Sequence, residues 1–132
     1  MLINFSNHPY DKWTEGQKKA AKIYGSVIDL PFPAVPADAD EEEIRLLAEE
    51  SVNKITSLLN DSKEEKEESA VMVQGETTLT YSVVTRLLKR NIKAISACSE
   101  RRMESHADEK GNITKTISFQ FERFREYKLY SL

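Results

Sequence analysis

The stretch Ala70-Val71-Met72-Val73-Gln74-Gly75-Glu76-Thr77-Thr78 decides the fold of this chain. Its first four residues are apolar and too few for a helix, which predicts a strand buried on both faces, as at the centre of a parallel sheet. Gly75 then permits a tight turn, and Thr77 or Thr78 can cap the helix that follows. Strand, turn and capped helix place free backbone N–H groups beyond the sheet, where phosphate is favoured. An ordinary strand-to-helix turn has the same sequence features.

Length and composition predict one domain that spans residues 1–132. The chain is 39% hydrophobic and 31% charged, as soluble globular proteins usually are. A net charge of -3 argues against a general binder of duplex DNA. A single cysteine excludes an intramolecular disulfide, and no run of residues approaches the roughly 20 apolar residues that a membrane span needs. We therefore expect a cytoplasmic protein that has no membrane partner.

Strand and helix patterns alternate along the rest of the chain. Short apolar strands are expected at residues 2–5, 27–30 and 92–98. Helices are expected after the capping residues Thr14 and Asp40, and again after the central strand. The run 62–69 contains no apolar residue, which predicts a solvated connection.

A hairpin is expected near the end of the chain. The fourth strand is predicted to end in the polar loop Ser99-Glu100-Arg101-Arg102, and residues 103–108 and 113–121 to pair around a turn. The alternating order of strands and helices predicts an α/β fold. We expect a Rossmann-like, doubly wound, mostly parallel sheet in the strand order 2-1-3-4, with a C-terminal β-hairpin beyond strand 4.

Four polar loops are expected at the carboxyl edge of this sheet, where α/β proteins bind ligands. They are residues 6–9, 31–36, 74–77 and 99–102. His8 serves there either as a general acid or base or as a structural loop residue. Arg101 and Arg102 either bind phosphate or are ordinary surface residues. The negative charge of Glu76 would repel a phosphate at this edge, unless its carboxylate binds a ribose hydroxyl or an arginine.

Missing motifs argue against several chemistries. Glycines at 16, 25, 75 and 111 form neither a Gly-x-Gly-x-x-Gly motif nor a Walker A loop, so a tightly held dinucleotide and NTP hydrolysis are not expected. Two distant histidines and one cysteine do not make a zinc site. We interpret Cys98 as a small buried strand residue rather than a nucleophile. The sequence predicts no metal site and no cofactor.

Five short motifs carry a resemblance to a known group. The chain resembles small single-domain CRISPR-associated proteins of the CARF-like and ring nuclease group of type III systems. The motifs are Asn4-Phe5-Ser6-Asn7-His8-Pro9, Asp29-Leu30-Pro31-Phe32-Pro33, Val73-Gln74-Gly75-Glu76, Ala97-Cys98-Ser99-Glu100-Arg101 and Phe124-Arg125-Glu126-Tyr127. The resemblance implies a homodimer that binds a cyclic oligoadenylate second messenger in antiviral defence. Metal-independent cleavage of the ring, or binding alone as a sensor or sponge, would both fit, and a small α/β interaction adaptor is a further alternative.

Candidate residues follow from the chemistry that this ligand needs. Metal-free cleavage requires a ribose 2′-hydroxyl in line with its phosphate, together with stabilisation of charge, for which Ser6, His8 and Arg101 are the catalytic candidates. The expected ligand-binding residues are Asn7, Phe32, Gln74, Gly75, Glu76, Thr77, Ser99 and Arg102. Phe32 or Tyr10 would stack on bases. A symmetric ring fits a two-fold homodimer, and we expect Phe32 and Val35 to be exposed at its interface.

Overall fold

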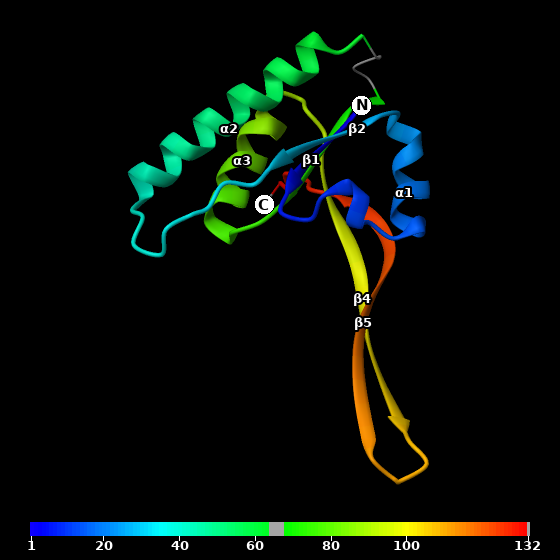
Figure 1. Cartoon of the computed structure of the whole chain (residues 1–132). Helices are drawn as coiled ribbons and strands as arrows, with labels where there is room; N and C mark the ends of the chain where they lie inside the picture. The colour runs from blue at the N-terminus through cyan, green and yellow to red at the C-terminus, as the bar shows by residue number, and fades with distance from the viewer. Residues whose placement is uncertain (64–67, 132) are drawn as a thin grey trace.

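The computed structural model describes residues 1–63 and 68–131, which form a five-stranded α/β sheet with helices on both faces (Figure 1). The strands are β1 (Leu2–Ser6), β2 (Val27–Pro31), β3 (Ala70–Gln74), β4 (Ala94–Ala107) and β5 (Ile113–Glu126). The helices are α1 (Glu15–Ala21), α2 (Glu41–Asp61) and α3 (Thr77–Lys89), with short 3-10 turns at Tyr10–Lys12 and Lys22–Tyr24. The expected connection at 62–69 falls partly outside the described residues, because these exclude 64–67. No helix in the described ranges is long and apolar enough to cross a membrane.

The sheet has the strand order β2-β1-β3-β4-β5. β1 pairs in parallel with β2 and β3, β3 pairs in parallel with β4, and β4 pairs antiparallel with β5. The predicted mostly parallel α/β sheet with a C-terminal hairpin is therefore confirmed. Two of the expected helix caps are confirmed as well, since Thr14 accepts from the backbone N–H of Gln17 and Asp40 from that of Glu43.

The fourth strand does not end where the sequence predicted. β4 continues through residues 99–102, and it pairs with β5 as far as Ala107 and Ile113, with one register shift between Cys98 and Ser99. The prediction of a polar loop at Ser99-Glu100-Arg101-Arg102 was wrong. A change from apolar to polar residues indicates the end of a strand that is buried on both faces, but a strand that is exposed to solvent can continue through polar residues. Residues 99–121 instead form a two-stranded ribbon, the arm, that projects from the body of the molecule (Figure 1).

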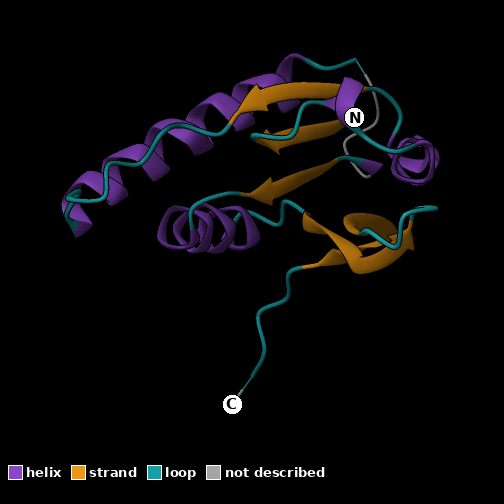
Figure 2. Ribbon diagram, turned by 60° about the horizontal axis from the view of Figure 1, so that its bottom comes forward, coloured by secondary structure: helices purple, strands orange, loops and turns teal. Residues whose placement is uncertain are grey.

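Two apolar cores lie on opposite faces of the sheet. Figure 2 shows the helices that pack around the strands. The larger core packs α2 and α3 against the side chains of Ile3, Phe5, Val71 and Val73. The smaller core joins Trp13 and α1 to the other face. The central strand β3 is buried along Ala70 to Val73, as its unbroken apolar run predicted.

Phe32 belongs to the larger core, which contradicts its expected exposure. Its side chain is 5% exposed, and its ring centroid lies 4.9 Å from that of Phe5. Val35 is half-buried against the same core. Phe32 therefore does not present a stacking surface to a base, and the pair does not form the exposed dimer surface that we expected. The backbone N–H of Phe32 donates to the Ser6 carbonyl at 3.3 Å, which ties this loop to the end of β1.

Phe32 also explains why residue 75 is glycine. A Cβ atom at Gly75 would lie 2.5 Å from the Phe32 ring, whereas positive φ angles in the described residues occur at Gly25, Gly111 and Asn91. The glycine is thus required by close packing and not, as the sequence suggested, by the conformation of a turn.

Gly75→Ala is expected to destabilise the protein by about 1–3 kcal/mol, because the added methyl group overpacks the Phe32 ring. The matched control is Gly16→Ala in α1, where a Cβ would find its nearest neighbours at 3.9 and 4.0 Å. Urea unfolding of both variants measures the difference. Equal unfolding midpoints for the two variants would contradict this reading of Gly75.

Candidate functional site

The carboxyl ends of three parallel strands meet at one edge of the sheet. Ser6 at the end of β1 is in register with Gln74 of β3 and with Pro31 of β2. Strand order reverses between β1 and β3, the position where α/β sheets bind ligands. The expected convergence of the loops after β1, β2 and β3 is therefore confirmed, while the fourth loop is part of β4.

A cavity of about 420 Å³ opens at this reversal, on the face of the sheet that α1 covers. We call it the β1–β3 pocket. It is lined by Ser6, Asn7, His8, Thr14, Gln17, Met72, Gln74, Ala97, Ser99, Phe119 and Phe121. Five of the predicted site residues thus lie together: Ser6, Asn7, His8, Gln74 and Ser99.

A buried hydrogen-bond network holds the rim of the pocket. Asn4 is 1% exposed, and its Nδ2 donates to Asp29 Oδ1 at 2.8 Å and to the carbonyl of His8 at 2.8 Å. The indole N–H of Trp13 donates to the same His8 carbonyl at 2.9 Å. The turn that carries His8 is thereby fixed to Asn4 of β1, which is itself bonded to Asp29 of β2, and to Trp13, which precedes the cap of α1. Sequence reasoning missed Asn4 as a positioning residue, although a polar residue in an apolar strand is a signal of such a role.

The Ser6 hydroxyl is part of this network. It donates to Asn4 Oδ1 at 2.6 Å and accepts from the backbone N–H of His8 at 3.2 Å. Its proton is therefore engaged within the protein, so Ser6 fits a positioning role for the turn better than a catalytic one. The His8 side chain is exposed at the rim.

Gln74 connects β3 to β4 where the ladder between them ends. Their backbone pairing covers Val71–Ala94 and Met72–Ile95. Beyond it, Gln74 Oε1 accepts from the backbone N–H of Ala97 at 2.8 Å, and Nε2 donates to the Ala97 carbonyl at 3.3 Å. The amide of Gln74 thus forms part of the pocket floor and is held by the backbone.

Glu76 occupies the N-terminus of α3. Its carboxylate accepts from the backbone N–H groups of Leu79 at 2.8 Å and Thr78 at 3.0 Å. These bonds lower the pKa of the Glu76 carboxyl below its usual value. Glu76, rather than Thr77 or Thr78, is the cap. The prediction of phosphate bound by the N–H groups at this turn is therefore not supported, because the chain's own carboxylate already binds the end of the helix.

The remaining predicted residues are dispersed. Gly75 and Thr77 line a second cavity of about 420 Å³ beside α3, on the opposite face of the sheet from α1. Arg101 pairs across the arm with Phe119, and Arg102 with Ser118, so their side chains lie on opposite faces of the ribbon. Arg102 also pairs with Glu100 at 3.3 Å. The two arginines cannot act as a pair on one phosphate.

The sequence analysis missed Phe119 and Phe121 as site residues. Both residues lie in the expected hairpin strand 113–121, and their alternation with polar residues is typical of any strand with one solvated face. The register shift after Cys98 brings Phe121 opposite Ser99, and Phe119 remains 65% exposed beside the pocket. Arg101 shares the face of the arm on which Phe119 lies.

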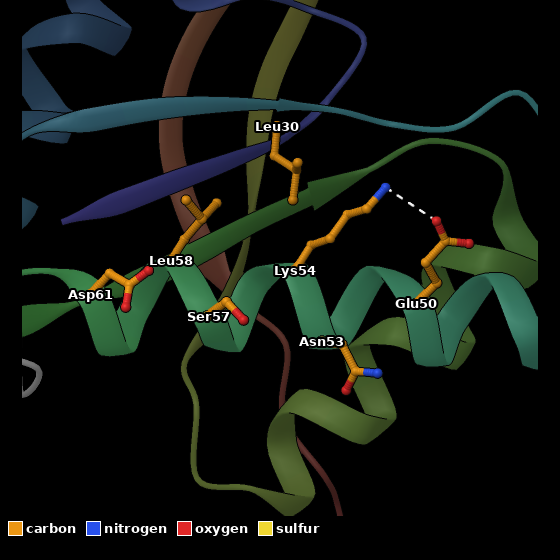
Figure 3. A pocket seen from close by; sticks show the side chains of 7 residues that line it. All are labelled: Leu30, Glu50, Asn53, Lys54, Ser57, Leu58 and Asp61. Carbon is orange, nitrogen blue, oxygen red and sulfur yellow. Dashed lines mark ion pairs between the residues drawn. The ribbon is translucent and has the colours of Figure 1, made fainter.

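Another cavity, of about 450 Å³, lies between β2 and α2 (Figure 3). Figure 3 shows Lys54 extending along the helix to an ion pair with Glu50, 3.2 Å apart. This pair has the i,i+4 spacing of helix surfaces. The cavity contains no residue of the predicted site. Within residues 1–63 and 68–131, no three His, Cys, Asp or Glu side chains are grouped so as to hold a metal ion.

Comparison with known proteins identifies a family. The profile described as the Uncharacterized protein MJ1673 family matches residues 1–125. The chain belongs to this family. The match runs from β1 to within one residue of the end of β5, and so it includes both the β1–β3 pocket and the arm. No curated protein matches the chain, and no solved structure matches it.

The cap at Glu76 predicts a pH-dependent contribution to stability. Since the folded-state pKa of this carboxyl is lowered, its contribution is present above the unfolded-state pKa and is lost as the pH falls through the folded-state pKa. Glu76→Gln is therefore expected to lower the thermal unfolding midpoint at pH 7, and to approach the parent protein below pH ~4. Calorimetry at a series of pH values measures this, with Glu122→Gln on exposed β5 as the control. A midpoint difference that is independent of pH would exclude the carboxylate cap as its cause.

Proposed function

We propose that the β1–β3 pocket binds a nucleotide ligand and that this ligand is a cyclic oligoadenylate. The observation that carries the proposal is the placement of Phe119 and Phe121 beside Asn7, His8 and Ser99, at the point where strand order reverses. Aromatic faces and neutral hydrogen-bonding groups are what an adenine base requires. The proposal includes a Rossmann-like, doubly wound classification of the sheet and a role in the cytoplasm, in type III CRISPR antiviral defence.

Arg101 supplies the charge that a phosphate needs. It lies on the same face of the arm as Ser99 and Phe119, two residues along β4 from Ser99 and directly opposite Phe119. Directly opposite residues of an antiparallel pair have Cβ atoms roughly 4.5–5.5 Å apart, a separation that the long arginine side chain can span. A base on Phe119 therefore brings its phosphate within reach of the guanidinium, whose planar group binds phosphate oxygens well.

His8 is the group in this pocket best suited to proton transfer. Its turn is fixed by Asn4 and Trp13, and its imidazole lies at the exposed rim, where a ligand would enter. In the proposed reaction, the ribose 2′-hydroxyl attacks the adjacent phosphate, and a 2′,3′-cyclic phosphate and a free 5′-hydroxyl result. The 2′-hydroxyl proton passes to a base, and the leaving oxygen takes up a proton; His8 performs one of these transfers. No metal ion is required for this scheme.

The two adjacent arginines provide a matched test of binding. Arg101→Ala is expected to weaken the binding of cyclic oligoadenylate by about 1.5–3 kcal/mol, which is roughly ten- to more than a hundredfold in affinity. Arg102→Ala removes the same charge from the opposite face of the arm and is expected to leave affinity unchanged. Phe119→Ala and Ser118→Ala repeat this comparison for stacking. Calorimetry with cyclic tri-, tetra- and hexa-adenylate in EDTA measures all four variants.

Chromatography of the same mixtures distinguishes an enzyme from a binding protein. A ring nuclease would form linear products, and the rate of their formation is expected to fall on the order of a hundredfold in His8→Ala while binding is retained. Tight binding without products would leave a sensor or sponge. Equal effects of Arg101→Ala and Arg102→Ala would contradict the placement of phosphate, and failure of every ring to bind would end this proposal and favour the adaptor.

A further inference from the structure

Cavities lie on both faces of the sheet where β3 and β4 separate. On the face that α1 covers, the cavity is the β1–β3 pocket. On the opposite face, the cavity of about 420 Å³ beside α3 is lined by Gln74 and Gly75 of β3 and by Ser96 of β4. We call this second cavity the α3 pocket. Gln74 lines both cavities, and the function proposed above uses only the first.

The walls of the α3 pocket are uncharged. Helix α3 lines it with residues at the spacing i, i+3, i+4 and i+7, which is that of one helix face: Thr77, Thr80, Tyr81 and Val84. Tyr127, which follows β5, lines another wall and is fixed there, because its hydroxyl donates to the Val73 carbonyl at 2.9 Å. None of the described residues that line the pocket carries a formal charge. Two aromatic side chains and a few neutral polar groups suit a small aromatic ring.

One hydroxyl group of this pocket lacks a partner. Thr80 Oγ1 is buried and forms no hydrogen bond with any described residue. A buried hydroxyl without a partner is destabilising and uncommon in folded proteins. Threonine populates two χ1 rotamers in helices, so a rotation can exchange its methyl and hydroxyl groups at the pocket wall. A ligand that accepts a hydrogen bond from Thr80 would satisfy a group that the chain leaves unpaired.

A guanidinium group lies on the same face of the hairpin as the pocket residue Ser96. Arg125 of β5 is directly opposite Ser96, and residues paired in this way have Cβ atoms roughly 4.5–5.5 Å apart on one face. The Arg125 side chain is exposed and forms neither an ion pair nor a hydrogen bond with any described residue. The carboxylate of Glu76, in contrast, is already bound by N–H groups of α3. An unpaired cation beside a neutral cavity favours an anionic ligand.

We propose that the α3 pocket binds a small aromatic anion. The ring of the ligand occupies the uncharged cavity beside Tyr81 and Tyr127, and Thr80 donates a hydrogen bond to it. The carboxylate or phosphate group of the ligand pairs with Arg125, whose planar guanidinium can bind two oxygens at once. A cavity of about 420 Å³ is at the lower end of the range of small-molecule sites, which fits a ligand of one or two fused rings.

Three related probes test the class of ligand. α-Naphthoate and α-naphthyl phosphate carry the two anionic groups, and the uncharged α-naphthamide is the control. Heteronuclear NMR titration of the intact chain is expected to shift the backbone amide signals of Thr80 and Ser96 with at least one anion, at a dissociation constant on the order of 1 mM or lower. The anion that binds more tightly identifies the group as carboxylate or phosphate. α-Naphthamide should bind at least roughly tenfold more weakly, and equal affinity for it would overturn the proposal.

Two arginines of the hairpin provide the matched variants. Arg125→Ala should weaken binding of the anion at least roughly tenfold. Arg102→Ala removes the same charge from the exposed arm and should leave the affinity unchanged. Circular dichroism of both variants verifies that the body remains folded. Equal affinities of Arg125→Ala and the parent protein would overturn the proposal.

Thr80→Val tests the hydroxyl, because it keeps the shape of the side chain and removes the unpaired group. Without ligand, it is expected to raise the thermal unfolding midpoint. It should also weaken binding of the anion roughly three- to tenfold, and undiminished binding would overturn the role of Thr80.

The α3 pocket and the β1–β3 pocket are distinguished by one further variant. Phe119→Ala, which is expected to weaken cyclic oligoadenylate binding, should leave the affinity for the naphthalene anion unchanged. Failure of both anions to bind, or signal shifts confined to Asn7 and His8, would overturn the proposal. None of these results depends on whether the β1–β3 pocket binds cyclic oligoadenylate.

Discussion

The amide of Gln74 bridges β3 and β4 at the point where these strands separate, and much of the molecule's shape depends on that bridge. Backbone pairing between the strands covers only two residues of each. Past this point the Gln74 amide alone satisfies the N–H and carbonyl of Ala97 on this side of β4. β4 is then free to turn away with β5. The β1–β3 pocket lies in the space between β4 and the ends of β1 and β3, and the outer part of β4 forms the arm together with β5.

The centre of the sheet could be predicted because its sequence signals are local and agree with one another. An apolar run of four residues identifies β3, and polar caps identify the starts of α1 and α2. The strand order then follows from the rules that govern parallel crossovers. β4 could not be predicted in the same way. Its outer half is polar because the arm is solvated, and polarity at Ser99 to Arg102 has the same appearance in a loop as in a solvated strand.

The edge of the sheet that carries the site was predictable, but the faces on which its residues lie were not. The strand ends identify Ser6, Gln74 and Ser99, and the structure places all three in one pocket. The role of Phe32 depends on a packing contact with Phe5 that no periodicity in a proline-rich loop reveals. Glu76 was misjudged since glutamate is not among the preferred caps, although its longer side chain reaches Thr78 and Leu79 here.

The β4–β5 hairpin and the centre of the sheet also differ in how they can fold. Ala107 pairs with Ile113 around a tight turn held by Asp108, whose carboxylate accepts from the N–H groups of Lys110 and Asn112. Such contacts form quickly because little chain entropy is lost in closing a short loop. The sheet centre, in contrast, pairs Leu2 with Ala70 and must bring distant segments of the chain together. The hairpin is therefore the segment that can form its native pairing fastest. It becomes stable only when β1 and β3, which assemble more slowly, have formed the sheet at its base.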